Sequence, residues 1–160
     1  MNRSLQEAGF DELDRAILEE LQVNGRISVA DLARKIHLSQ PAVHNRIRRL
    51  EREGIIREYV ALVDREMVGF DLLCFVEISI QTHSNEQISA VEKAVYALPE
   101  VLECYRMMGQ CDLLIKIAIR SRKELDRFIG ERLTTLPGIE RVQTNLVLNE
   151  VKTTTALPLK

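Results

Sequence analysis

The stretch that decides the fold is LSQPAVHNRIRRLEREGII, residues 38–56. Ser39 is a preferred helix N-cap, and Pro41 falls in the first turn, where its missing N–H breaks no hydrogen bond. Apolar side chains then recur at the spacing of one buried helix face, at Val43, Ile47 and Leu50. The sequence therefore predicts a helix that begins after Ser39 and ends near Gly54.

The opposite face of this predicted helix is polar and basic. At about 100° per residue, it carries Pro41, His44, Asn45, Arg48, Arg49 and Arg52. Residues 34–57 hold seven basic residues against two acids, whereas the whole chain has a formal net charge of −2. Because a local basic patch attracts phosphates, and Arg and Asn bind base edges, this face indicates binding to double-stranded DNA. A plain amphipathic helix would leave so one-sided a charge unexplained.

Two shorter helices are predicted before the basic one. The first has Asp11 as its N-cap, and Gly25 is expected to end it in the left-handed conformation that glycine tolerates. The second begins at Ser28 with a capping-box sequence, and its apolar stripe consists of Val29, Leu32, Ala33 and Ile36. A tight turn at His37 leads into the basic helix. This arrangement is typical of a helix-turn-helix, whose second helix enters the major groove.

The rest of the chain alternates between strand and helix patterns. After a strand over residues 55–63 and a linker over 64–69, we predict strands at 72–81, 101–108, 112–119 and 141–151 and helices from Asn85 and over 121–136. A Leu-Pro pair links each helix to the following strand, at residues 98–99 and 136–137. This internal repeat predicts a ferredoxin-like βαββαβ sheet with both helices on one face.

The strand at 112–119 is apolar on both faces, because Leu114 and Ala118 alternate with Leu113 and three isoleucines. Helices can cover only one face of the predicted sheet. The other face should therefore be buried against another subunit, which predicts a dimer at minimum.

A membrane or secreted protein is not indicated. No apolar run is long enough to span a bilayer, and Met1–Glu7 lacks the apolar core of a signal peptide. We therefore expect a cytoplasmic protein with no membrane partner.

Metal, cofactor and catalytic sites are not indicated either. The chain has three cysteines, Cys74, Cys104 and Cys111, which form no C-x-x-C pair. We expect all three to be free thiols, and the alternative is a redox role for Cys111. Three histidines are scattered without an apparent nucleophile partner: His37, His44 and His83.

From about Phe10 to Lys152, the chain resembles the Lrp/AsnC family of transcription regulators. The resemblance rests on the order and spacing of short motifs: Leu13-Asp14-x-x-Ile17-Leu18, Asn24-Gly25-Arg26-Ile27-Ser28, Leu38-Ser39, Val43-x-x-Arg46-Ile47-x-x-Leu50-Glu51-x-x-Gly54-Ile55-Ile56, Val101-Leu102-Glu103-Cys104, Gly109-x-x-Asp112, Leu136-Pro137-Gly138-Ile139 and Glu150-Val151-Lys152. It implies a winged-type helix-turn-helix, a linking strand and a ferredoxin-like domain that senses amino acids. It also implies dimers that pair through their sheets and assemble into octamers.

The resemblance places the effector between subunits, near the turn after the second strand. Gly109 and Asp112 map onto that turn, and the expected pocket also takes strand-end positions Met107, Met108, Leu114, Thr144 and Asn145. Met107 and Met108 stand where the family often has a small apolar residue and a Thr or Ser, and Leu113 where it often has an aromatic residue. These departures favour an apolar amino acid such as leucine or methionine. The alternative is that Gly109 and Asp112 only make a tight turn.

The expected fold class is thus α+β, with a helix-turn-helix domain at residues 1–60, a linking strand or hinge at 61–71, and a ferredoxin-like effector-binding and oligomerisation domain at 72–160. The expected DNA contacts are Ser39, Gln40, Pro41, His44, Asn45, Arg46, Arg48, Arg49 and Arg52. Among them, Asn45 and Arg48 are expected at bases, and Arg46, Arg49 and Arg52 at phosphates. The alternatives to a sequence-specific regulator are an effector-independent architectural DNA-binding protein and, remotely, a regulatory subunit of an enzyme.

Overall fold

The computed structural model describes residues 10–81 and 84–159, so the Met1–Glu7 stretch and His83 lie outside the described residues. The chain divides into two compact units. One unit runs up to Leu62 and also includes the segment that begins at Lys152, and the other comprises Val63–Val151. The segment after Val151 therefore groups with the predicted helix-turn-helix rather than with the ferredoxin-like domain, where the expected boundary of 72–160 put it.

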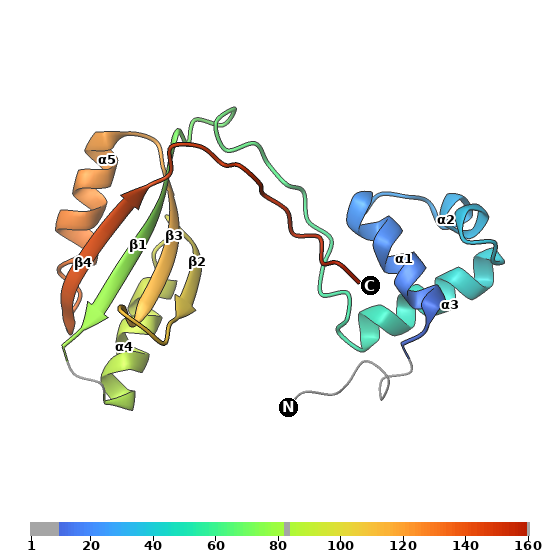
Figure 1. Ribbon diagram of the computed structural model, residues 1–160, viewed down its shortest axis with the longest axis horizontal. Coiled ribbons are helices and arrows are strands. Elements are labelled where there is room, and N and C mark those ends of the chain that lie inside the picture. Colours follow the sequence, from blue (N-terminus) through green and yellow to red (C-terminus); the bar gives the residue numbers. More distant parts are fainter. Residues whose placement is uncertain (1–9, 82–83, 160) are drawn as a thin grey trace. The chain divides into compact units, whose positions relative to one another are not determined.

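The first unit contains three helices, α1 (Glu12–Val23), α2 (Val29–Lys35) and α3 (Gln40–Arg52) (Figure 1). Each begins at the predicted cap, because the side chains of Asp11, Ser28 and Ser39 accept hydrogen bonds from backbone N–H groups of the first turns. The core between the helices is built from the predicted apolar stripes and includes Ile17, Leu18, Leu32, Ala33, Val43 and Leu50. The helix-turn-helix is confirmed.

The two turns of this unit differ in how they use the left-handed backbone conformation. Asn24, rather than a left-handed Gly25, ends α1 in an extended conformation with φ −143°, and the prediction for Gly25 is wrong. The positive φ occurs at His37, at 56°, in the tight turn between α2 and α3. Only a few per cent of non-glycine residues adopt this conformation, so the turn is specified by the surrounding helices rather than by a glycine.

The strand predicted over residues 55–63 is not formed by this chain, whose backbone there lies outside helices and strands. A strand needs a hydrogen-bonded neighbour, and no described strand pairs with this segment. Val60, Leu62 and Val63 are exposed. A hydrogen bond links Tyr59 to the end of α3, because its hydroxyl donates to Glu51 Oε1 at 3.1 Å. Burial, together with this hydrogen bond, raises the pKa of Tyr59 to about 12.

The second unit is a four-stranded antiparallel sheet with helices. Its elements are β1 (Leu72–Ile80), α4 (Asn85–Tyr96), β2 (Val101–Arg106), β3 (Leu113–Ile119), α5 (Arg122–Arg127), the π-helical segment η2 (Phe128–Leu133) and β4 (Ile139–Leu146). The strand order is β2-β3-β1-β4, which confirms the ferredoxin-like topology. The predicted last strand at 141–151 is displaced, because β4 begins at Ile139 and ends at Leu146.

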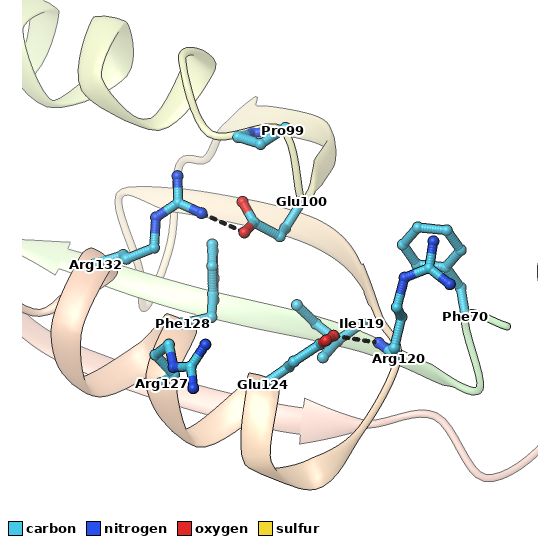
Figure 2. Close-up of a pocket in the computed structure, with 9 residues that line it drawn as sticks. All are labelled: Phe70, Pro99, Glu100, Ile119, Arg120, Glu124, Arg127, Phe128 and Arg132. Atoms are coloured by element: carbon cyan, nitrogen blue, oxygen red, sulfur yellow. Dashed lines mark hydrogen bonds and ion pairs between the residues drawn. The ribbon is translucent and has the colours of Figure 1, made fainter.

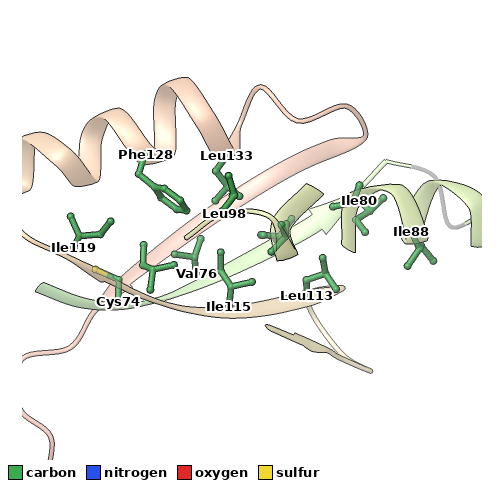
Figure 3. Close-up of a cluster of buried hydrophobic side chains, with 14 residues drawn as sticks. Cys74, Val76, Ile80, Ile88, Leu98, Leu113, Ile115, Ile119, Phe128 and Leu133 are labelled. Carbon is green, nitrogen blue, oxygen red and sulfur yellow. The ribbon is translucent and has the colours of Figure 1, made fainter. Parts of the chain in front are cut away.

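The core of this unit lies between the sheet and its helices (Figure 3). Alternate residues of β1 and β3, including Val76 and Ile115, are fully buried against α4, α5 and η2. Figure 3 shows Phe128 and Leu133 pointing from the helical layer toward these strands. Helices therefore cover one face of the sheet, as predicted.

The opposite face of the sheet is less uniformly apolar than predicted. Leu73 and Ala118 pair across β1 and β3 on this face and are buried within the chain. Further along the same strands, Glu77 pairs with Leu114, and Lys116 forms an ion pair with Glu103 at 3.1 Å. The face thus has an apolar end and a polar end, because charged side chains alternate into it from all four strands. Within the described residues, no helix has the length and apolar character needed to cross a bilayer.

Candidate functional site

The outward face of α3 presents most of the side chains predicted to contact DNA. Seven of the nine are exposed: Ser39, Gln40, Pro41, His44, Asn45, Arg48 and Arg52. Neither Arg48 nor Arg52 has an ion-pair partner among the described residues. Their guanidinium groups are therefore available, without breaking an internal contact, for anionic or base-edge acceptors.

The other two predicted contacts, Arg46 and Arg49, turn inward instead. Arg46 Nη1 lies 2.9 Å from Asp14 Oδ1 and 2.8 Å from Asp11 Oδ2, and Arg49 binds the second oxygen of Asp14. Asp14 is fully buried. The placement of Arg49 on the outer face was wrong, because its long side chain reaches back across α3 to a buried carboxylate. A buried charge requires such partners.

The pKa values of Asp11 and Arg46 are both shifted in the direction that favours their charged forms. The hydrogen bond from the Asp14 backbone N–H, with the neighbouring Arg46, lowers the pKa of Asp11. The hydrogen bond to Asp14, together with that to Asp11, raises the pKa of Arg46. The arginine therefore stays charged, and two of the three predicted phosphate contacts are committed to joining α3 to α1.

The predicted effector turn lies between β2 and β3 and is held to β1 by backbone contacts. Met107 N–H donates to the Asp112 carbonyl at 2.8 Å, and Asp112 N–H donates to the Ile78 carbonyl at 2.9 Å. The Asp112 carboxylate also accepts from Ile80 N–H at 2.8 Å. These bonds anchor the turn, which is the alternative role considered for Asp112. Gly109 has no positive φ, and a Cβ there would meet nothing within 4 Å.

The expected effector residues do not converge on one cavity in the described part of this chain. Met108 is fully exposed, and Thr144 pairs with Val76, so it lies on the helix side of the sheet. Leu114 and Asn145 lie on the opposite face, where Asn145 Nδ2 donates to Glu77 Oε1 at 3.1 Å. The predicted set is therefore divided between the two faces.

A polar hollow of about 130 Å³ lies beside this turn instead, lined by Glu77, Ser79, Gln110, Cys111, Arg141 and Gln143. Register explains it, because Glu77 pairs with Gln143, and Ser79 with Arg141. These four positions were not predicted from the sequence, although Glu77 and Ser79 alternate with apolar residues in the pattern of a strand with one polar face. The hollow offers a guanidinium and a carboxylate a few residues from the predicted turn.

All three cysteines are free thiols. Cys74 is buried, Cys104 is exposed and Cys111 is half-buried. Burial raises the pKa of the Cys111 thiol, and the carboxylates of Glu77 and Asp112 raise it further. The thiol therefore stays protonated near neutral pH, which disfavours the redox role considered for it.

Two family models match the chain. Residues 10–51 match the AsnC-type helix-turn-helix domain, and residues 73–157 match the Lrp/AsnC ligand binding domain. The chain is similar to the leucine-responsive regulatory protein of Escherichia coli K12, with 37% identity over 151 residues, which cover 94% of this chain and 92% of that protein.

Solved structures with the same fold include regulators crystallised with an amino acid. A transcriptional regulator of Neisseria meningitidis in complex with L-methionine has a TM-score of 0.89 at 33% identity, covering 93% of this chain and 96% of that one. E. coli AsnC has a TM-score of 0.86 at 30% identity, covering 92% and 98%. These relatives are transcription regulators rather than enzymes. The chain belongs to the Lrp/AsnC family of DNA-binding transcription regulators, with an N-terminal helix-turn-helix and a C-terminal ligand-binding domain.

Proposed function

We propose that this regulator recognises its operator with the exposed face of α3, using Asn45 and Arg48 at bases and Arg52 at phosphates. The observation that carries the proposal is the division of four arginines within one helix. Arg46 and Arg49 are bound to Asp14, whereas Arg48 and Arg52 are exposed and have no ion-pair partner among the described residues. The helix therefore separates arginines that hold the fold from arginines that can bind a ligand.

Gel shifts over a salt series test this division. Arg48→Ala should cost roughly 1–3 kcal/mol and relax sequence preference, whereas Arg52→Ala should weaken all sequences alike and lower the salt slope by about one. Arg122→Ala is the matched control, because Arg122 is an exposed arginine in α5 of the other unit. Unchanged operator affinity in the Arg48→Ala/Arg52→Ala double variant would contradict the proposal.

The effector is an apolar α-amino acid, bound in the polar hollow beside the 107–112 turn. Two chemical groups support this choice: Arg141 can hold a carboxylate and Glu77 can accept from an ammonium. Asp112 then serves to hold the turn, while Met107 and Met108 lie at its start, where flexible thioethers can cover an apolar side chain. Structural relatives in complex with L-methionine, one at 28% identity from M. tuberculosis, are consistent with this ligand class.

Calorimetric titration with L-leucine and L-methionine tests the effector site. Arg141→Gln should weaken binding by about tenfold or more, because it removes a charge-assisted hydrogen bond. Arg122→Gln, the control, should bind like the unmodified chain. If neither amino acid binds, or if Arg141→Gln binds as well as the control, the hollow is not the effector site.

The assembly is a dimer through the uncovered sheet face, with dimers joined into an octamer in the cytoplasm. Aromatic side chains of that face support pairing, because Phe75 is only partly buried and Tyr105 is half exposed in the single chain. Light scattering at micromolar concentration tests this assembly, and a stable 18.3 kDa monomer would contradict it. Fractionation of cells tests the location.

A further inference from the structure

A second cavity lies at the opposite end of the sheet from the 107–112 turn. It has a volume of about 370 Å³, within the range of small-molecule sites. Its walls come from the segment just before β1, the end of β3, the α4–β2 connection and the α5–η2 helix (Figure 2). Because Leu72 pairs with Ile119, the first residue of β1 and the last of β3 meet at this edge.

The cavity has an apolar floor and wall. Phe128 and Ile119 are almost fully buried and line it from η2 and β3, and Phe70 lines it from the segment before β1. Figure 2 shows Ile119 and Phe128 between the charged groups at either side. The cavity can therefore receive a branched or aromatic apolar group.

Five charged side chains surround this floor, and four of them are already engaged. Arg132 forms an ion pair with Glu100. Glu124 Oε2 accepts from the backbone N–H of Arg120 at 3.2 Å, and the Arg120 guanidinium stacks over Phe70 at 4.3 Å. Three arginines against two glutamates leave the lining with one net positive charge.

The fifth charged side chain is Arg127, which lines the cavity and has no ion-pair or hydrogen-bond partner among the described residues. It is also exposed, so a ligand can reach it. The excess charge of the cavity is thus concentrated on a guanidinium, the group that binds carboxylates in bidentate geometry.

We propose that this cavity binds a small organic monoanion, a carboxylate joined to a branched or aromatic apolar body. The carboxylate pairs with Arg127, and the body packs on Phe128, Ile119 and Phe70. Arg132 neutralises Glu100, although Glu100 Oε2 is buried without a hydrogen-bond partner, and Glu124 accepts from the backbone N–H of Arg120, so the lining keeps one net positive charge. A 2-oxo acid therefore fits the net charge better than the corresponding zwitterionic amino acid.

A ligand here would contact the segment that leads out of the ferredoxin-like unit. Arg120 donates to the Val68 carbonyl at 3.2 Å, and Gly69, at φ +84°, approaches so closely that a Cβ would lie 3.0 Å from Arg120 Nη1. Phe70, which stacks on the same guanidinium, follows directly. A ligand in the cavity would therefore affect the position of the turn at residues 65–69, through Arg120 and Phe70.

Calorimetric titration of the full chain tests the proposal with 4-methyl-2-oxopentanoate and phenylpyruvate, compared with L-leucine and L-phenylalanine. Acetate, which lacks the apolar body, and inorganic phosphate are the control ligands. Arg127→Gln should weaken 2-oxo acid binding by about tenfold or more. Arg122→Gln removes an exposed arginine from the same helix outside the cavity and should leave binding unchanged.

The proposal is wrong if neither 2-oxo acid binds, if Arg127→Gln binds them as well as Arg122→Gln does, or if only the amino acids bind in an Arg127-dependent manner. Equal binding of phosphate would also overturn it, because the site would then select charge alone. Arg141→Gln should not alter 2-oxo acid binding. Its effect on amino acid binding reports separately on the effector site proposed above, so the two sites can fail independently.

Discussion

The buried carboxylate of Asp14 in α1 accepts a hydrogen bond from Arg46 in α3, with 2.9 Å between Oδ1 and Nη1. Arg49 binds the other oxygen of the same carboxylate. One acidic residue therefore fixes the helix proposed to contact DNA against the first helix of its unit. Because Asp14 has no exposed surface, its charge depends on these two arginines rather than on water.

Asp14→Ala should destabilise the helix-turn-helix unit by about 1–3 kcal/mol, because Arg46 and Arg49 both lose a charged hydrogen-bond acceptor. Urea denaturation followed by circular dichroism measures the loss. Glu19→Ala is the control, since Glu19 is exposed on the same helix, and should stay within about 0.5 kcal/mol of the unmodified chain. Equal stability of the two variants would show that the ion pairs do not hold the unit.

Neighbouring arginines of α3 should differ in their effect on stability. Arg49→Ala should lower the free energy of unfolding by about 1–3 kcal/mol, because Asp14 loses a charged donor. Arg48→Ala should leave it within about 0.5 kcal/mol, since Arg48 is exposed. Thermal denaturation of both variants checks this, and a destabilised Arg48→Ala would contradict the division.

Acid should weaken this unit through Asp11, whose pKa is lowered by the hydrogen bond from Asp14 N–H and by Arg46. A carboxyl with a depressed folded-state pKa adds stability above its unfolded value of about 3.9 and loses it as the pH falls through the folded value. Asp11→Asn should remove this contribution. As the pH is lowered from neutral into the acid range, the denaturation midpoint of Asp11→Asn should then fall less steeply than that of the unmodified chain. An identical pH dependence of the two midpoints would show that other groups cause the loss of stability in acid.

The C-terminal segment should stabilise the helix-turn-helix unit. The Leu157 N–H donates to Gln22 Oε1 at 2.6 Å, Gln22 Nε2 donates to the Leu157 carbonyl at 3.1 Å, and Leu159 packs on the helical core. Gln22→Ala should therefore cost roughly 1 kcal/mol and speed removal of the last residues by carboxypeptidase. Digestion at the rate of the Glu19→Ala control would show that the contact does not hold the segment.

Local patterns predicted most of the fold because they depend on neighbours in sequence. The caps at Asp11, Ser28 and Ser39 and the alternation in β1 and β3 follow from spacing alone. Other features depend on partners that spacing does not identify. The segment at 55–63 lacked a strand to pair with, and Arg49 reached a carboxylate 35 residues away in sequence.

The candidate sites were predicted less completely, for a related reason. The exposed face of α3 follows from one helical period, whereas the hollow at Glu77 and Arg141 requires the register between β1 and β4. A one-residue change in register would send Arg141 to the other face. The cavity at Arg127 joins four segments and has no sequence signature.

The return of the C-terminal segment has a consequence for biosynthesis. Because Leu159 packs on the core of the helix-turn-helix unit, this contact forms only after the segment that follows Val151 has left the ribosome. Domains generally fold in order of their emergence, yet here the first to emerge is the last to be finished. In a nascent chain, the helix-turn-helix unit is therefore fully assembled only after the ligand-binding unit has been translated.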